Sequence, residues 1–333
     1  MYMNFSKTIF ITILIMSTLM VISSKSWINC WISLEINLMF FIPLIFIKNN
    51  TLNNEFLMKF FFIQLITSMI LIMSITFMNL KIHLTLNKFI LIFNLTLLMK
   101  MGVAPFHYWM IQIIEYLNWP SFFILMTWQK IAPMIMIMYT LNLNLMMIMI
   151  LINCLTGSIN GFNQLYMRKM LFFSSINNMG WLLSTLIMNL FMWLIFFSVY
   201  FLSMMILIFL IYMTNTNNMN QLFNNNNSIN NFNIIMLLLS LSGLPPLIGF
   251  FPKWMILIFF INMENLIIYL MMIITLLNLY FYLRLFTPIL LLATFSTKWI
   301  KFNPIKNNPS YLTSLIILMI MSFSFFPLAY FYY

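Results

Sequence analysis

Four ionisable side chains stand inside long apolar segments of this 333-residue chain. Glu35 lies in WISLEINLMFF, Lys100 in LTLLMKMGVAPFHYW, Lys130 in TWQKIAP and Lys253 in GFFPKWM. A charge at the centre of a membrane span costs about 2.5–3.5 kcal/mol on insertion scales, so such residues are rare and usually functional. The four residues are therefore candidates for moving ions or protons.

A lysine near the end of a membrane span has a simpler explanation, because its long side chain can reach the lipid headgroups. That explanation suits Lys25 and Lys88. It is weaker for Lys100 and Lys130, which lie well inside their apolar segments. Lys253 is deep only if residues 232–261 form one interrupted helix.

Proton transfer suits these residue types. Burial disfavours a charged amine and a nearby carboxylate favours it, so a lysine that moves relative to Glu35 takes up or releases a proton. His107 follows the Lys100 segment, and imidazole titrates near neutral pH. His107 is either a proton relay or a hydrogen-bonded structural residue. We predict no metal site.

Helix-breaking residues accompany two of the lysines. Proline removes a backbone donor and clashes with the preceding turn. Non-helical backbone is tolerated inside a membrane only where it is buried in protein or lines a water-filled cavity. A lysine beside each break thus indicates a hydrated path rather than a plain kink. The predicted breakers are Gly102 and Pro105 in the first stretch, and Gly243, Pro245, Pro246, Gly249 and Pro252 in the second.

The composition defines the fold class. Hydrophobic residues make up 64% of the chain and charged residues 6%, against about 25% charged in soluble domains. We predict an all-α polytopic membrane protein without a soluble domain. The net charge of +11 comes from scattered cations, with Arg168–Lys169 the only adjacent pair, so we expect no nucleic-acid partner. Residues with AT-rich codons abound, which suggests an organelle genome.

Apolar segments of about 20 residues, the length that spans a bilayer, recur almost from end to end. We predict eleven spans, at 5–23, 27–47, 56–79, 87–108, 121–140, 143–161, 168–188, 190–213, 232–261, 264–287 and 311–332. Nine cations then fall on the N-terminal side and three on the other. By the positive-inside rule the N-terminus faces the matrix of a mitochondrion, and the C-terminus faces the intermembrane space.

The two interrupted segments occupy matching places. If spans 1–5 and 6–10 are five-helix units, each break falls in the fourth span, and a tandem odd-numbered unit has inverted topology. Broken helices at matching positions mark a midplane transport site. We therefore predict inverted repeats at 1–141 and 142–287, with a loop and final helix at 288–333, in one membrane domain. We align no sequence motif between the halves.

Five stretches of the chain resemble one family of membrane proteins. They are SLEINLMFFIPL (33–44), LLMKMGVAPFHYW (97–109), TWQKIAP (127–133), RKMLFFSSINNMGW (168–181) and LSLSGLPPLIGFFPKW (239–254). The family that they resemble is NADH-ubiquinone oxidoreductase chain 2, mitochondrially encoded antiporter-like membrane subunits of respiratory complex I. The resemblance covers most of the chain from the second to the ninth span, and the tail after Arg284 carries little of it.

The resemblance implies two inverted five-helix repeats, and a charged axis of Glu35, Lys100, Lys130 and Lys253 that couples quinone reduction elsewhere to proton movement. Animal members of the family lack the first three of fourteen helices, in agreement with eleven spans. The family often has histidine where this chain has Asn178, so a relay there is doubtful. The other membrane subunits of complex I and phospholipids are the implied partners.

Two other classes of protein share some of these features. A free-standing cation/proton antiporter would have the same broken helices, although such carriers commonly bind cations with acids, and this chain has no Asp and one deep Glu. A two-haem cytochrome needs more histidines than His83 and His107. The chain lacks a GxGxxG loop and a cysteine cluster for iron–sulfur ligation. We expect no cofactor in it, with NADH, FMN, iron–sulfur clusters and ubiquinone handled by other subunits.

Overall fold

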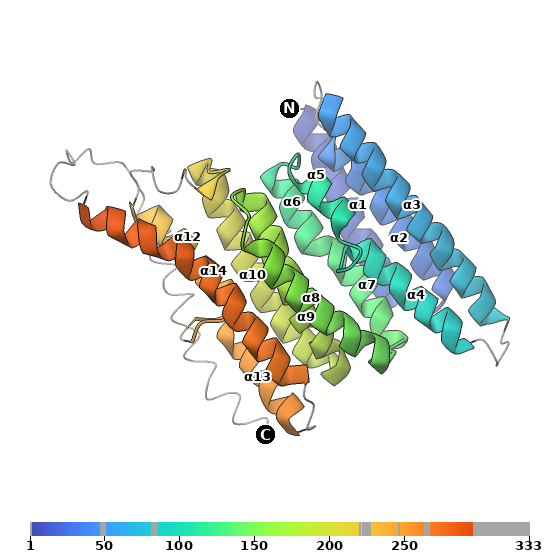
Figure 1. Cartoon of the computed structure of the whole chain (residues 1–333). Helices are drawn as coiled ribbons and strands as arrows, with labels where there is room; N and C mark the ends of the chain where they lie inside the picture. The colour runs from blue at the N-terminus through green and yellow to red at the C-terminus, as the bar shows by residue number, and fades with distance from the viewer. Residues whose placement is uncertain are drawn as a thin grey trace. The chain divides into compact units, whose positions relative to one another are not determined.

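The structure is a computed structural model, and its secondary-structure elements are labelled as in Figure 1. It describes residues 2–46, 51–80, 86–219, 221, 228–245, 247–262 and 267–295. Within these ranges the elements are all α-helices, apart from one isolated bridge between Tyr166 and Asn218. In lipid a helix satisfies its own backbone hydrogen bonds, which is why so apolar a chain folds this way.

The chain divides into two compact units, Met1–Asn153 and Cys154–Tyr333. The division lies inside α8 (Leu143–Gly161), so it falls later than the boundary at 141 predicted for the repeats. The first unit also contains α1 (Tyr2–Ser23), α2 (Trp27–Ile45), α3 (Thr51–Asn79), α4 (Leu86–Met101), α5 (Tyr108–Ile114), α6 (Trp119–Met126) and α7 (Trp128–Tyr139). The second contains α9 (Met167–Met188), α10 (Leu190–Thr214), α12 (Ser228–Ser242), α13 (Phe250–Asn262) and α14 (Ile267–Phe295).

In the first unit, α4 packs between α3 and α7, and α2 packs between α1 and α3. This arrangement brings Glu35 on α2 near the end of α4. In the second unit, α10 packs against α9, α12 and α13, while α14 packs against α12 and α13. Within α9 almost every side chain is buried, including the polar run Ser174-Ser175 and Asn177-Asn178. The polar groups in the middle of α9 are thus kept inside the protein.

Among the described residues, eight helical stretches are long and apolar enough to cross a membrane, judged by length and composition. They coincide with eight predicted spans to within a few residues. The predicted spans 87–108 and 232–261 are the interrupted ones, divided into α4–α5 and α12–α13 (Figure 1). The eleventh, 311–332, lies outside the described residues. The polytopic helical class is confirmed, and the count of eleven stays a prediction.

The first interrupted span extends further than predicted. After the break the chain resumes a helix at Tyr108 and continues to Ile114, whereas the sequence indicated an end at 108. The span at 121–140 also contains an interruption that the sequence did not indicate. Thr127 separates α6 from α7 with φ −116° and ψ −69°, and its hydroxyl donates to the carbonyl of Phe123 at 2.7 Å. Lys130 therefore lies in the first turn of a helix.

The two predicted breaks begin with the same backbone motif. In each, a glycine with positive φ follows the helix, Gly102 at 63° and Gly243 at 86°. The Gly102 N–H donates to the Met99 carbonyl and the Val103 N–H to Leu98. Likewise, the N–H groups of Gly243 and Leu244 donate to Ser240 and Leu239. This bonding is the Schellman motif, which uses glycine because a side chain disfavours the left-handed conformation.

The next turns of the two breaks also correspond. The Phe106 N–H donates to the Val103 carbonyl at 2.8 Å, and the Leu247 N–H donates to Leu244 at 2.9 Å. With these pairs aligned, Pro105 corresponds to Pro246 in the sequence, although Pro246 lies outside the described residues. A short motif, glycine followed three residues later by proline, is thus common to both halves. Sequence reasoning missed this motif because Lys100 precedes Gly102 whereas Lys253 follows Gly243 at a greater distance.

Candidate functional site

Lys100 and Glu35 form an ion pair in the first unit. Lys100 is the second-last residue of α4, and its Nζ lies 3.6 Å from Oε1 of Glu35 on α2. The lysine side chain is 5% exposed and the glutamate side chain 18%. Removing one partner of a buried ion pair costs about 3–5 kcal/mol, because the other charge is left uncompensated. The structure thus brings together two of the four predicted residues.

The backbone of the first break is supported by side chains from two other helices. Asn153 on α8 accepts a hydrogen bond from the Ala104 N–H at 2.8 Å, and its own amide donates to Met149. Gln64 on α3 donates to the Lys100 carbonyl at 3.4 Å. These amides satisfy polar groups that an unbroken helix would satisfy itself. The break is therefore an ordered element that fixes the position of Lys100.

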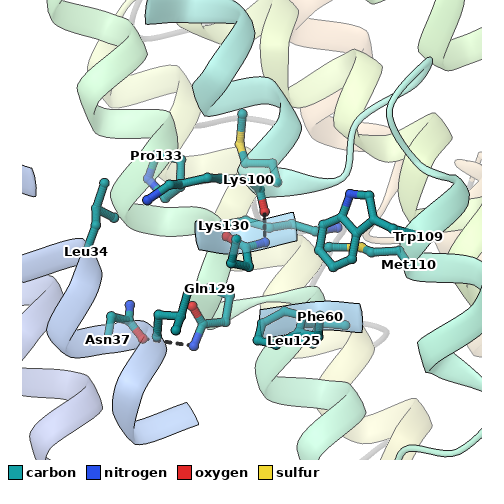
Figure 2. A pocket seen from close by; sticks show the side chains of 13 residues that line it. Leu34, Asn37, Phe60, Lys100, Trp109, Met110, Leu125, Gln129, Lys130 and Pro133 are labelled. Atoms are coloured by element: carbon teal, nitrogen blue, oxygen red, sulfur yellow. Dashed lines mark hydrogen bonds between the residues drawn. The ribbon is translucent and has the colours of Figure 1, made fainter. Parts of the chain in front are cut away.

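A cavity borders Lys100 and Lys130 (Figure 2). The volume of this cavity is about 30 Å³, and one buried water needs about 10–15 Å³. Gln129 crosses one side and donates to Oδ1 of Asn37 at 2.9 Å, as Figure 2 shows. Lys130 is 2% exposed. The cavity beside Lys100 thus has room for water, and its polar lining residues can bind that water, as predicted for a hydrated path.

Lys253 is held by the end of a helix rather than by an acid. It lies in the first turn of α13, and its Nζ donates to the carbonyls of Leu241 at 3.1 Å and Ser242 at 2.8 Å. These are the last residues of α12, where carbonyls lack helical partners and the helix dipole favours a cation. The Trp181 ring lies 5.7 Å from Nζ. Lys253 therefore joins the two halves of the broken span.

Gly243 and Gly249 provide the space for this arrangement. A Cβ on Gly243 would lie 2.8 Å from Cδ and 3.2 Å from Nζ of Lys253. A Cβ on Gly249 would overlap the backbone of Ser240. Both glycines are thus required by close approach, and Gly243 also by its positive φ.

The other predicted breakers have different roles. Pro105 and Pro245 are exposed residues within the non-helical turns. Pro252 is the third residue of α13, where the missing N–H costs nothing because first-turn donors lack helical partners. Pro252 therefore starts a helix rather than breaking one. The role predicted for Pro246 falls outside the described residues.

The two possible relay residues lie in different surroundings. His107 precedes α5, is 2% exposed and stacks on Tyr108 with ring centres 4.6 Å apart. It is absent from the lining of the first cavity. Asn178 on α9 is 2% exposed and lines a second cavity together with Lys253. Of the two possible relay residues, Asn178 is thus the one that lines a cavity next to a predicted lysine, Lys253.

Sequence reasoning missed the amides that surround the first break. Asn37, Gln64, Gln129 and Asn153 all lie inside apolar segments, which is the available signal. Asn is so common in this chain that single asparagines inside helices did not stand out. Gln129 adjoins Lys130 and Asn37 follows Glu35 by two residues, so proximity to the charged residues would have identified both.

Comparisons with known proteins place the chain in a family. Residues 24–278 match the family described as NADH:quinone oxidoreductase/Mrp antiporter, TM. NADH-ubiquinone oxidoreductase chain 2 of Anopheles gambiae is 39% identical over 92% of each chain. The protein of the same name from Locusta migratoria is 34% identical over 88% of each. The chain belongs to the NADH-ubiquinone oxidoreductase chain 2 family.

Solved structures share the fold of this chain 2 family member at low sequence identity. A chain of respiratory complex I from Thermus thermophilus with bound aureothin is similar with a TM-score of 0.78 and 15% identity. That match covers 96% of this chain and 78% of the other. A chain of the Mrp complex from Dietzia sp. gives a TM-score of 0.71 at 13% identity, covering 84% and 59% respectively. Complex I and the Mrp complex thus contain the same helical architecture.

Proposed function

We propose that this chain is a proton-translocating core membrane subunit of mitochondrial NADH:ubiquinone oxidoreductase, the respiratory complex I of the inner membrane. The observation that carries the proposal is the buried Lys100–Glu35 ion pair, at a water-sized cavity beside an ordered helix break. Such a pair holds a proton when the charges are close and releases it when they separate. Because the chain belongs to the chain 2 family, the enzyme in which this proton transfer would operate is NADH:ubiquinone oxidoreductase.

In this proposal the chain contributes proton movement, and other subunits carry out the redox chemistry. NADH, FMN, iron–sulfur clusters and ubiquinone would bind to those subunits. The sequence supports this division, since it contains only Cys30 and Cys154 as thiolate ligands and lacks a GxGxxG loop. The partners are other membrane subunits of complex I, and phospholipids cover the apolar surface that remains. The distribution of cations along the sequence supports an N-terminus that faces the matrix.

We also propose that the two halves are inverted repeats, each built around one break. The matching Schellman motifs at Gly102 and Gly243, and the sequence correspondence of Pro105 with Pro246, support this arrangement. Discontinuous helices at matching places in two repeats are typical of transport sites. Lys100 and Lys253 would then be the proton-carrying residues of the two repeats, with Lys130 a further one in the first.

The proposal is tested by Glu35→Gln in the assembled complex, with Glu55→Gln as the matched control. Glu55 is an exposed acid on α3, so its replacement should leave activity unchanged. Glu35→Gln removes the charge that stabilises protonated Lys100, and we expect proton translocation by inner-membrane vesicles to fall together with coupled NADH oxidation. Full activity of Glu35→Gln in a fully assembled complex would refute the role of the pair.

Purification distinguishes this function from that of a free-standing cation/proton antiporter. The tagged chain should co-purify with other complex I subunits, and liposomes that contain the chain alone should show no exchange of Na⁺ for protons. Recovery of the chain alone from native membranes, with such exchange, would favour the antiporter.

A further inference from the structure

Two amide side chains form one wall of the cavity beside Lys100 and Lys130. Gln129 donates a hydrogen bond from Nε2 to Oδ1 of Asn37 at 2.9 Å, and both residues line the cavity (Figure 2). The bond joins α7 to α2 across 92 positions of the sequence. Because the two lysines and the two amides border the same space, the amides are placed to bind water that lies beside the lysines.

The interruption at Thr127 fixes the position of Gln129. Since α7 begins just after Thr127, Gln129 is the second residue of this helix and Lys130 the third. The Lys130 N–H donates to the Thr127 carbonyl at 3.2 Å and closes the first turn. Successive residues of a helix point about 100° apart, at 3.6 residues per turn, so the two side chains approach the cavity from adjacent directions. The break that places Lys130 thus also places Gln129.

The protein uses only part of the hydrogen-bonding capacity of this amide pair. Each amide has two N–H donors and an oxygen with two lone pairs. Within the described ranges, the bond between Gln129 and Asn37 is the only hydrogen bond that either side chain makes. Asn37 is 3% exposed, and buried polar groups without hydrogen bonds are costly. Nδ2 of Asn37 and Oε1 of Gln129 are therefore available to water in the cavity.

The cavity has the size and the polar groups that a bound water needs. Its volume of about 30 Å³ gives room for about two waters, at roughly 10–15 Å³ each. A buried water makes two to four hydrogen bonds. Gln129 offers an acceptor, Asn37 a donor, and a lysine ammonium a further donor. A water that accepts from an ammonium and donates to the Gln129 oxygen has a fixed orientation.

We propose that Gln129 and Asn37 are positioning residues for proton transfer between Lys100 and Lys130. Gln129 donates to Asn37, and its oxygen holds a cavity water with a lone pair directed at the ammonium of Lys100. When Lys100 releases its proton, an N–H bond breaks and an O–H bond forms on this water, which takes the positive charge. The water then gives another of its protons to the neutral amine of Lys130, where an N–H bond forms. The inference rests on the proposed function, in which both lysines carry protons.

The test removes the amide groups one at a time in the assembled complex. Gln129→Met and Asn37→Leu keep the approximate size of each side chain and remove its hydrogen bonds. Gln112→Met makes the first change at an exposed position of α5. Measurements are complex assembly, NADH oxidation with an artificial acceptor, coupled proton translocation, and the effect of D₂O on the translocation rate.

We expect Gln129→Met and Asn37→Leu to assemble and to lower proton translocation several-fold. The solvent isotope effect should rise in both, because transfer through water that is no longer oriented becomes slower and limits the rate more strongly. Gln112→Met should match the unmodified protein. An equal loss in Gln112→Met would show that the effect is not specific to the cavity and would overturn the inference.

A pair of shortened and lengthened amides separates positioning from packing. Gln129→Asn should break the hydrogen bond, and Asn37→Gln added to it restores the combined length of the two side chains. We expect the double variant to regain translocation and the normal isotope effect relative to Gln129→Asn alone. Equal values in the two would overturn the role of the bond. Should Gln129→Met fail to assemble, Gln129→Asn keeps a polar side chain and must itself show the raised isotope effect.

Lys130→Met separates the inference from the function on which it rests. Normal translocation and isotope effect in Gln129→Met, with translocation lost in Lys130→Met, would overturn the role of the amide pair alone. Normal translocation in both variants would also overturn the role proposed for Lys130.

Discussion

Lys100 and Lys253 stand beside comparable breaks but meet different counter-charges. Lys100 pairs with the Glu35 carboxylate, whereas Lys253 binds two carbonyls at the end of α12. A full negative charge stabilises an ammonium more strongly than the partial charge of a helix end. The two ammonium groups are thus stabilised by different kinds of negative charge, a carboxylate for Lys100 and helix-end carbonyls for Lys253.

Asn153 illustrates how one amide supports the first break. Its side chain accepts the Ala104 N–H, and the asparagine is fully buried. Asn153→Leu should leave that donor unsatisfied and destabilise the subunit by about 1–3 kcal/mol. The thermal midpoint of the purified complex would measure the effect, with Asn160→Leu as the control on the same helix at a partly exposed position. Equal midpoints for the two variants would show that the hydrogen bond contributes nothing.

The broken spans show which features of an element the sequence can predict. Glycine, proline and lysine carry local signals, so the sequence predicts breaks near Gly102 and Gly243, the two glycines that have positive φ in the structure. The interruption at Thr127 has neither glycine nor proline beside it, and the sequence gave no sign of it. The pairing of Gln129 with Asn37 joins residues far apart in the sequence. Such contacts depend on how helices pack, which composition and spacing do not specify.

Gly102→Ala tests the conformation of the first break. Gly102 has φ 63°, and a Cβ there would lie 2.6 Å from Sδ of Met110. The left-handed conformation alone costs a residue with a side chain about 1–2 kcal/mol, and movement of Met110 would disturb the cavity wall. We expect less assembled complex and slower proton translocation. The control is Gly161→Ala, where a Cβ meets its nearest atom at an ordinary 3.4 Å. Unchanged assembly and translocation in Gly102→Ala would contradict the account.

At the scale of the whole molecule, the count and direction of spans are predictions from apolar length and from the distribution of cations. An odd number of spans would put the two termini on opposite sides of the membrane, and the positive-inside rule predicts that the N-terminus faces the matrix. A break divides an apolar span into two shorter helices. The pairs α4–α5 and α12–α13 are therefore not counted as membrane spans when helix length is the criterion, although their glycine and proline residues indicate an interrupted span. Composition therefore predicts the class better than the count.

Epitope tags at the two ends of the chain test this topology. After rupture of the outer membrane, protease should remove a C-terminal tag and leave an N-terminal tag intact, because the matrix stays sealed. A matrix protein that remains undigested is the control for the inner membrane. Removal of both tags, or of neither, would mean an even number of spans.

The central claim is that buried lysines beside helix breaks carry protons for complex I. It is tested most directly by the number of protons translocated per NADH oxidised in membrane vesicles with Lys100→Met, against Lys88→Met. Both residues lie on α4, and Lys88 is exposed near its start. We predict that Lys88→Met keeps the ratio and rate of the unmodified complex, whereas Lys100→Met loses coupled proton translocation in a complex that still assembles. An unchanged ratio and rate in assembled Lys100→Met would contradict the claim.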